Sequence, residues 1–127
     1  MNVDLSQLNE EQRLPVLHTE GAVLVTAGAG SGKTRLLTHR ICHIINDLGD
    51  KPYNILALTF TNKAANEMKE RLEKMGCDNS LWVFTFHALC VRILRKYADL
   101  IGFKSNFTIY AEQEKLSLIK KISRIKK

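Results

Sequence analysis

The stretch AVLVTAGAGSGKT, residues 22–34, is the most informative part of this chain for its expected fold. Its first five residues form an apolar run typical of a buried strand, and an amphipathic segment begins at Arg35. The small residues between them let successive backbone N–H groups turn toward a polyphosphate, with the positive end of a helix dipole behind them. This order predicts a phosphate-binding loop of eight residues, which are Ala27, Gly28, Ala29, Gly30, Ser31, Gly32, Lys33 and Thr34.

Two side chains of this loop carry its expected chemistry. Lys33 is placed to reach the β- and γ-phosphates of a nucleotide, and the Thr34 hydroxyl is placed to complete the shell of a Mg²⁺ ion. Ala27 stands where the general pattern has glycine, and alanine is the smallest replacement. The competing interpretation is a glycine-rich turn that only packs a strand against a helix.

Helix-like and strand-like patterns alternate after the loop. Apolar residues recur on one helical face up to the expected stop at Gly49, namely Leu36, Leu37, Ile41, Ile44, Ile45 and Leu48. Residues 55–59 and 81–85 are apolar runs of the buried-strand type, with a helix expected between them from about 64 to 75. Three strands joined by helices require right-handed crossovers and a parallel sheet. The predicted fold class is α/β, with the loop at the carboxyl end of the first strand.

The segment after Gly102 differs from the rest. Residues 107–110 could form a short strand, and a helix is expected after it, with Glu112 and Glu114 in its first turn. Residues 123–127 contain no capping or stop signal, so we expect the chain to continue in a larger protein.

Composition and charge limit the class of protein. The chain has 127 residues, enough for one modest core, and it contains neither an apolar stretch of about 18 residues nor a signal-peptide pattern. We therefore expect no membrane partner. Three widely spaced cysteines fit reduced thiols in a cytoplasmic protein rather than a disulfide framework. The net charge is +6, and residues 92–127 alone carry +7. This basic stretch suggests a polyanionic partner such as nucleic acid, with a solvated helix face as the alternative.

Four stretches together resemble the start of UvrD/Rep/PcrA-type superfamily 1 DNA helicases. They are Leu8-Asn9-Glu10-Glu11-Gln12, the loop at 27–34, Thr59-Phe60-Thr61-Asn62-Lys63-Ala64-Ala65 and Thr85-Phe86-His87. The loop alone is shared by kinases, GTPases and many ATPases, whereas the string that begins at Thr59 is narrow. The resemblance implies an incomplete RecA-like parallel sheet flanked by helices. Residues 1–85 would be the first part of domain 1A, and residues 86–127 would begin the helical inserted domain 1B.

The resemblance also assigns a site for ATP and Mg²⁺. The Gln12 amide would read the adenine edge, the loop would hold the phosphates with Mg²⁺ on Thr34, and Arg35 would lie against the adenine. Each assignment has a structural alternative. Asn9 and Gln12 have the spacing of a helix capping box, and Arg35 could be an ordinary exposed helix residue. Pro15 is expected to shorten or kink the helix that carries Gln12.

A second site follows from the motifs at the ends of the second and third expected strands. The resemblance places single-stranded DNA, and junctions of single and double strands, against Thr59, Phe60, Thr61, Asn62, Thr85 and His87. An aromatic face such as that of Phe60 stacks on any base, and hydroxyl and amide groups position the phosphates. The alternative for Phe60 is core packing at a strand end.

The implied activity is ATP-driven translocation along single-stranded DNA with 3′→5′ polarity and duplex unwinding. Hydrolysis in this family needs a strand-end Asp-Glu pair and γ-phosphate arginines, and none of the aspartates in this sequence fits that pattern. We therefore expect these 127 residues to bind nucleotide without turning it over, and the rest of the polypeptide to be a partner. A stand-alone nucleotide-binding or DNA-binding module is the alternative. A small-molecule kinase is disfavoured because it leaves the motifs at Phe60 and His87 unexplained.

Overall fold

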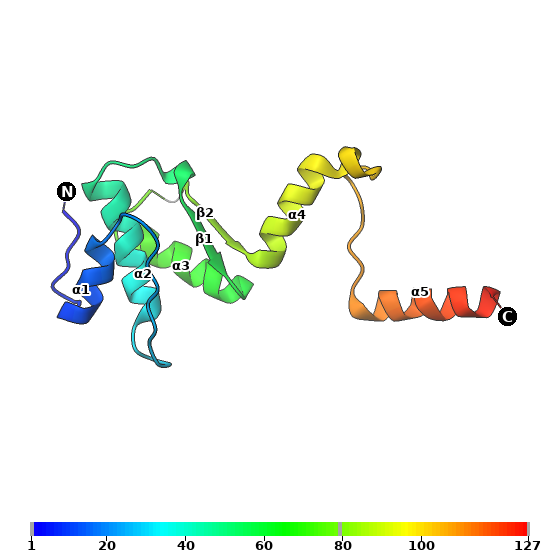
Figure 1. Ribbon diagram of the computed structural model, residues 1–127, viewed down its shortest axis with the longest axis horizontal. Helices are drawn as coiled ribbons and strands as arrows, with labels where there is room; N and C mark the ends of the chain where they lie inside the picture. Colours follow the sequence, from blue (N-terminus) through cyan, green and yellow to red (C-terminus); the bar gives the residue numbers. More distant parts are fainter. Residues whose placement is uncertain (1, 79, 127) are drawn as a thin grey trace. The chain divides into compact units, whose positions relative to one another are not determined.

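The computed structural model describes residues 2–78 and 80–126, which fall into two compact units, Met1–Leu89 and Cys90–Lys127. Figure 1 shows the order of the elements along the chain. In that order they are α1 (Glu10–Leu17), α2 (Lys33–Cys42), the π turn η1 (His43–Asp47), the 3₁₀ turn η2 (Pro52–Asn54), β1 (Leu56–Thr59), α3 (Asn62–Lys74), β2 (Trp82–Thr85), α4 (Phe86–Tyr97), the 3₁₀ turn η3 (Ala98–Ile101) and α5 (Glu112–Ile125).

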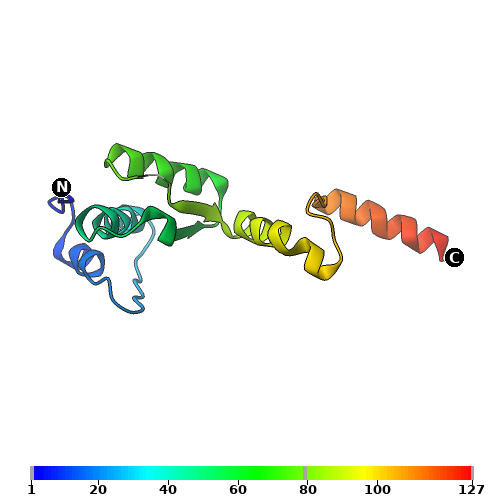
Figure 2. The ribbon, with the colours of Figure 1, turned by 90° about the horizontal axis from the view of Figure 1, so that it is seen from above.

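A parallel pair of strands joined by a helix forms the centre of the first unit. β1 and β2 pair in register from Leu56 with Trp82 to Thr59 with Thr85. Helix α3 connects them and packs against both strands, as Figure 2 shows. This βαβ arrangement confirms the predicted α/β class with a parallel sheet. Because the strands are in register, the residues that follow them emerge together at one edge.

The expectation of a first strand at residues 22–26 is wrong for the described chain, whose sheet contains only β1 and β2. Val23, Leu24 and Val25 are 40%, 89% and 39% exposed. An apolar run becomes a strand only where a neighbouring strand takes up its backbone hydrogen bonds, and none of the described residues does so here. The short strand considered at 107–110 is also absent, and Ile109 and Tyr110 are exposed there.

The core of the first unit lies between α2, α3 and the two strands. Its buried residues are Ile41, Cys42, Ala57, Ala65, Met68, Leu72, Cys77, Leu81 and Val83. All three cysteines of the chain are free thiols, two of them in this core and Cys90 on the surface. Packing of α3 on this core positions both of its ends relative to α2.

The ends of the helices follow the signals in the sequence. The helical region that starts with α2 continues through η1 to Asp47, and Gly49 follows with φ +77°. Helix α3 begins after Thr61, whose side chain accepts a hydrogen bond from the Ala64 N–H. It ends before Gly76, whose φ is +69°. A positive φ is the backbone region that favours glycine, so the expected stop at Gly49 is confirmed, and Gly76 follows the end of the helix that is expected to reach about residue 75.

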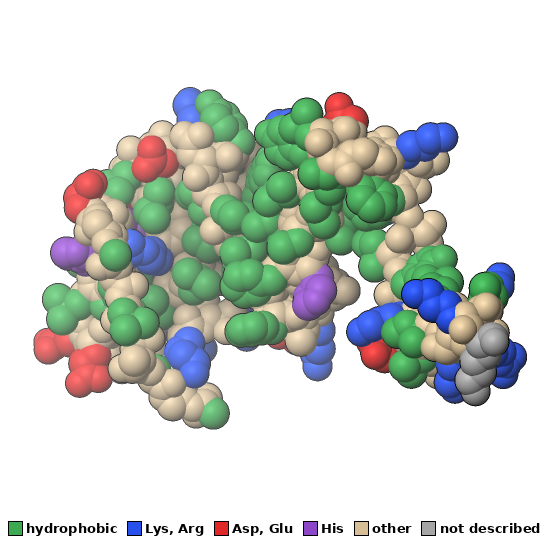
Figure 3. All heavy atoms as spheres, turned by 45° about the vertical axis from the view of Figure 1, so that its right-hand side comes forward, with side chains coloured by type: hydrophobic (Ala, Val, Ile, Leu, Met, Phe, Trp, Pro, Cys, Tyr) green, Lys and Arg blue, Asp and Glu red, His purple; other side chains and the backbone are tan. Residues whose placement is uncertain are grey.

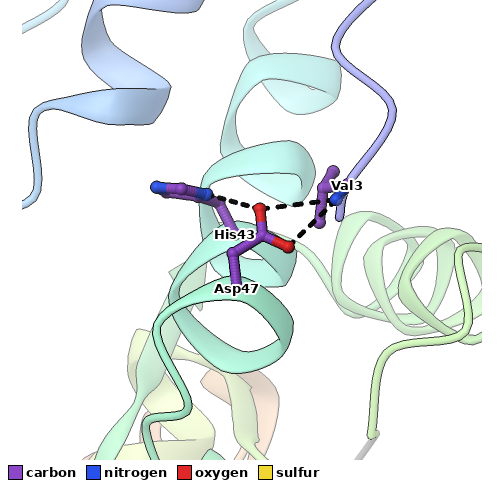
Figure 4. A network of polar contacts seen from close by, with 3 residues as sticks. All are labelled: Val3, His43 and Asp47. Atoms are coloured by element: carbon purple, nitrogen blue, oxygen red, sulfur yellow. Dashed lines mark hydrogen bonds and ion pairs between the residues drawn. The ribbon is translucent and has the colours of Figure 1, made fainter. Parts of the chain in front are cut away.

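The residues before α1, which we call the N-terminal arm (2–9), and α1 itself are held against α2 and η1. The Asp47 carboxylate accepts hydrogen bonds from the Val3 N–H, at 3.0 and 3.3 Å, and lies 2.6 Å from His43 Nδ1 (Figure 4). Leu8, Val16 and Leu36 form a second small core between α1 and α2. The Arg40 guanidinium also donates to the backbone carbonyl of Pro15, near the end of α1. These contacts fix α1, and therefore Gln12, relative to the start of α2.

The second unit contains most of α4, η3 and α5. The Arg95 guanidinium lies 4.8 Å from the centre of the Phe107 ring and donates to the Ser105 carbonyl at 2.9 Å. Helix α5 forms as predicted, and the Glu114 carboxylate accepts a hydrogen bond from the Ala111 N–H at its start. Within the described residues, no helix is long and apolar enough to cross a lipid bilayer.

Candidate functional site

The loop of residues 27–34 leads directly into α2 and leaves the start of that helix open. Gly30 and Gly32 have φ values of +74° and +86°, which side-chain-bearing residues rarely adopt. Residues 28–31 form a turn, which is closed by hydrogen bonds from the Ser31 N–H and the Ser31 hydroxyl to the Gly28 carbonyl. The residue before α2 is Gly32, so no side chain caps the helix. The first N–H groups of α2 are therefore available to an anion.

The two loop residues with expected chemistry are both exposed. Lys33 folds back over the loop, where its Nζ donates to the Ala27 carbonyl at 2.9 Å. Thr34 is an exposed residue in the first turn of α2, and its carbonyl accepts a hydrogen bond from the Thr38 hydroxyl. The Ala27 carbonyl thus holds the Lys33 ammonium beside the loop. The ammonium can exchange this carbonyl for a stronger acceptor.

Gln12 combines the capping role with a contact to the loop. Asn9 Oδ1 accepts from the Gln12 N–H at 2.8 Å, and Gln12 Oε1 accepts from the Asn9 N–H at 3.1 Å, which confirms the capping box. The other end of the amide, Nε2, donates to the Ser31 carbonyl at 3.0 Å. It lies so close to Gly32 that a Cβ there would come within 2.8 Å of it. One N–H of Nε2 remains for a ligand.

A hollow of about 440 Å³ brings these residues together at the start of α2. It is lined by Gln12, Gly30, Ser31, Gly32, Lys33, Thr34, Arg35 and Arg71. Its cations, Lys33, Arg35 and Arg71, take part in none of the ion pairs among the described residues, and no carboxylate lines this space. Such a surface suits a polyanion.

Arg71 is the residue of this hollow that sequence reasoning missed. It lies in the last turn of α3, 36 positions after Arg35, and reaches the loop because α3 packs against α2. It also lines a second hollow of about 430 Å³ together with Arg35 and His39. In the sequence it is one of several charged residues on an amphipathic helix, so only the packing of the two helices reveals it.

The edge where β1 and β2 end carries the second set of predicted residues. Phe60 is 89% exposed, so the interpretation of this ring as core packing is wrong. Asn62 and His87 are exposed at the starts of α3 and α4. The register that aligns Thr59 with Thr85 brings both motifs to this one edge.

The three threonine hydroxyls at this edge are already used in the protein. The Thr61 and Thr85 hydroxyls accept hydrogen bonds from Ala64 and Ala88 N–H groups, both at 3.1 Å, and each keeps its own O–H as a donor. The Thr59 hydroxyl instead donates to the Thr61 carbonyl at 3.1 Å. The exposed Thr61 can therefore donate to a phosphate while it caps α3, whereas Thr85 is buried where it caps α4 and Thr59 has no further O–H to give.

Residues 8–127 match the family model described as the UvrD/REP helicase N-terminal domain. The chain belongs to the UvrD/REP helicase family. It is 52% identical over 124 residues to the ATP-dependent DNA helicase PcrA of Staphylococcus aureus strain Mu50, covering 96% of this chain and 17% of the relative. It is 51% identical, with the same coverage, to the PcrA helicase of Staphylococcus epidermidis strain RP62A. The chain therefore spans about a sixth of the length of these UvrD/REP relatives.

Proposed function

We propose that this chain is the ATP- and single-stranded-DNA-binding N-terminal part of an ATP-dependent 3′→5′ DNA helicase of repair or replication. The observation that carries the proposal is the hollow at the start of α2, in which Gln12, the loop residues 30–34 and Arg35 surround one space, whereas loop residues 27–29 do not line it. These residues come from two helices and a loop, and they are the ones that the family resemblance gives to the nucleotide. The name of the PcrA relatives, ATP-dependent DNA helicase, supports the same activity.

The phosphates of ATP bind along the loop. The Lys33 ammonium exchanges the Ala27 carbonyl for phosphate oxygens, which are stronger acceptors because they are charged. The N–H groups at the start of α2 donate to the same phosphates. The exposed Thr34 hydroxyl is a fitting ligand for Mg²⁺, which takes one or two protein oxygens and keeps several waters. When bound, Mg²⁺ neutralises phosphate charge.

The base and sugar lie toward Gln12 and the two arginines. The free N–H of Gln12 Nε2 reads the adenine edge, and the planar Arg35 guanidinium stacks on the ring. Arg71 adds a third positive charge to the hollow, beside Lys33 and Arg35. We assign Arg71 to the ribose or a phosphate of the nucleotide because its guanidinium can donate to hydroxyl and phosphate oxygens.

Single-stranded DNA, or the single strand at a junction, lies along the edge where β1 and β2 end. Phe60 stacks on a base, and the Thr61 hydroxyl, Asn62 and His87 position the backbone. Thr85 is buried and acts from behind this edge, where it caps the helix that begins with Phe86 and His87. None of these groups reads base identity by itself, so the binding is indifferent to sequence. Because Thr59 donates internally, its hydroxyl contributes to the shape of the edge rather than to a phosphate contact.

The motor requires more than these residues. We propose that residues 1–85 are the first part of RecA-like domain 1A and residues 86–127 the beginning of domain 1B, in a cytoplasmic protein whose remaining domains complete the ATP site. The water-orienting Asp-Glu pair and the γ-phosphate arginines come from the rest of the polypeptide, which comprises the remainder of domains 1A and 1B and a second RecA-like domain. A single arginine finger accounts for about 10³–10⁵ in rate, so this chain alone binds ATP without turnover.

The test is calorimetry with Mg²⁺ and ATP on three versions of the chain. Lys33→Ala is expected to weaken binding about tenfold or more, the value of one charge-assisted hydrogen bond. The control Lys51→Ala, an exposed lysine outside the hollow, leaves affinity unchanged. Equal affinities of the unsubstituted chain and Lys33→Ala contradict the nucleotide site. Steady ATP hydrolysis that Lys33→Ala abolishes contradicts the absence of turnover.

A further inference from the structure

Two phenylalanines form a ring pair at the edge where β1 and β2 end. Thr59 and Thr85 are the last paired residues of the two strands, so Phe60 and Phe86 are the next residue on each strand. Their ring centres lie 5.5 Å apart, and the rings are tilted by 42°. Phe60 is 89% exposed and Phe86 is 46% exposed. Figure 3 colours hydrophobic side chains of this type green.

The spacing of the two rings excludes a base between them. A base stacked on both faces needs a gap of about 3.5 Å on each side, or about 7 Å between the two rings. The observed 5.5 Å is instead within the range of attractive tilted ring pairs. Phe86 therefore contacts Phe60 and leaves the outer face of Phe60 to the ligand.

The two rings differ in how firmly the backbone holds them. Phe86 is the first residue of α4, and the buried Thr85 hydroxyl caps that helix through the Ala88 N–H at 3.1 Å. Phe60 lies in the bend between the end of β1 and the start of α3. An exposed side chain on a bend has several rotamers, and ordering it on binding costs affinity. Because Phe86 stands at the capped start of α4, its ring can hold the Phe60 ring in one orientation in the free chain. Part of the cost of ordering Phe60 is then removed before the ligand binds.

We propose that Phe86 is a positioning residue for single-stranded DNA, which holds the Phe60 ring in the orientation that stacks on a base. This inference rests on the proposed function of Phe60. Phe86 makes no stack of its own with the DNA, so its effect on affinity passes through Phe60 and disappears when the Phe60 ring is absent.

The experiment is a double-mutant cycle in which fluorescence anisotropy follows binding of a labelled oligothymidylate. Phe60→Ala is expected to weaken binding about 5- to 100-fold, the loss of one base stack. Phe86→Ala weakens it about 2- to 10-fold, the range of one aromatic pair, and has no further effect in the Phe60→Ala background. Phe86→Tyr, which keeps the ring, restores affinity. Tyr97→Ala, a half-exposed aromatic on the same helix, is the matched control and leaves affinity unchanged.

A second variant and an NMR spectrum of the free protein distinguish a loss of folding from a loss of the positioning contact. Phe86→Leu retains the apolar volume and the helix start, and it is expected to weaken binding as Phe86→Ala does. In the free chain it moves the NMR signals of the Phe60 ring protons, because the neighbouring ring current is gone.

Three results would overturn the positioning role. They are an equal effect of Phe86→Ala in both backgrounds, full affinity of Phe86→Leu, and Phe60 ring signals that do not move in Phe86→Leu. If Phe60→Ala itself binds normally, the stacking at Phe60 in the proposed function fails, and the inference fails with it. If Phe60→Ala binds weakly and Phe86→Ala normally, only the inference fails.

Discussion

Gln12 uses both ends of its side-chain amide within the protein. Its oxygen completes the cap of α1, and its nitrogen contacts the loop carbonyl of Ser31. The sequence presented capping and nucleotide contact as alternatives, since spacing cannot show where the far end of a side chain goes. In the structure the cap orients the amide so that its nitrogen faces the loop.

Substitutions at the two partners of the capping box separate these roles. Asn9→Ala removes the cap and is expected to lower the free energy of unfolding by about 1 kcal/mol, with a small effect on ATP affinity. Gln12→Ala keeps the backbone N–H that donates to Asn9 Oδ1, but it removes the reciprocal bond of the capping box, the loop contact and the proposed adenine contact, so it lowers both stability and affinity. Thermal unfolding and ATP calorimetry on both variants measure the difference. Equal ATP affinities of Asn9→Ala and Gln12→Ala would remove Gln12 from the nucleotide site.

The three thiols are expected to differ in reactivity. Burial raises the pKa of the Cys42 thiol, and the neighbouring Cys77 raises it further. Burial also raises the pKa of Cys77. Since the thiolate is the reactive form, only the exposed Cys90 reacts quickly with a thiol reagent in the folded chain. A Cys90→Ser variant then shows no fast phase, and all thiols react in denaturant. A persistent fast phase in Cys90→Ser would show that the core described here opens readily.

At the scale of elements, the helices and the paired strands were predictable and the first strand was not. The stop at Gly49 acts through local backbone geometry, so the sequence alone indicates it. Residues 22–26 have the apolar pattern of a strand, but forming one depends on a neighbour elsewhere in space. Arg71 was missed for the same reason, because its role depends on how α3 packs against α2.

The contact between the N-terminal arm and η1 depends on one carboxylate. Asp47→Ala removes the acceptor of the Val3 N–H and the partner of His43, and it is expected to destabilise the first unit by about 1–3 kcal/mol. Amide exchange at Val3 becomes faster in the same variant. The matched control, Asp50→Ala, changes an exposed carboxylate nearby and leaves both quantities unchanged. Slow exchange at Val3 in Asp47→Ala would show that the arm is held by other contacts.

At the scale of the whole molecule, positive charge is concentrated in residues 92–127, which carry +7, against −1 for residues 1–91. In α5 three of these cations, Lys120, Lys121 and Arg124, line one hollow of the second unit. This placement favours an electrostatic contribution to DNA binding that is separate from the stacking at Phe60.

The salt dependence of binding separates the two contributions. The logarithm of the affinity for single-stranded DNA falls with the logarithm of salt concentration, with a slope of about −0.7 per phosphate neutralised. Lys120→Gln/Lys121→Gln is expected to make this slope shallower, whereas Phe60→Ala lowers affinity at every salt concentration with the slope unchanged. Lys51→Gln/Lys69→Gln removes the same charge outside the basic stretch and serves as the control. Equal slopes for both double variants would identify the basic face of α5 as a solvated surface without a role in binding.

Binding of ATP at the start of α2 can be followed residue by residue by amide NMR during a titration with Mg²⁺ and ATP. The largest shifts are expected at the Gly30, Gly32 and Thr34 amides, and Lys33→Ala is expected to reduce them. Shifts confined to other parts of the chain, with these three amides unmoved at saturating ATP, would contradict binding at this site.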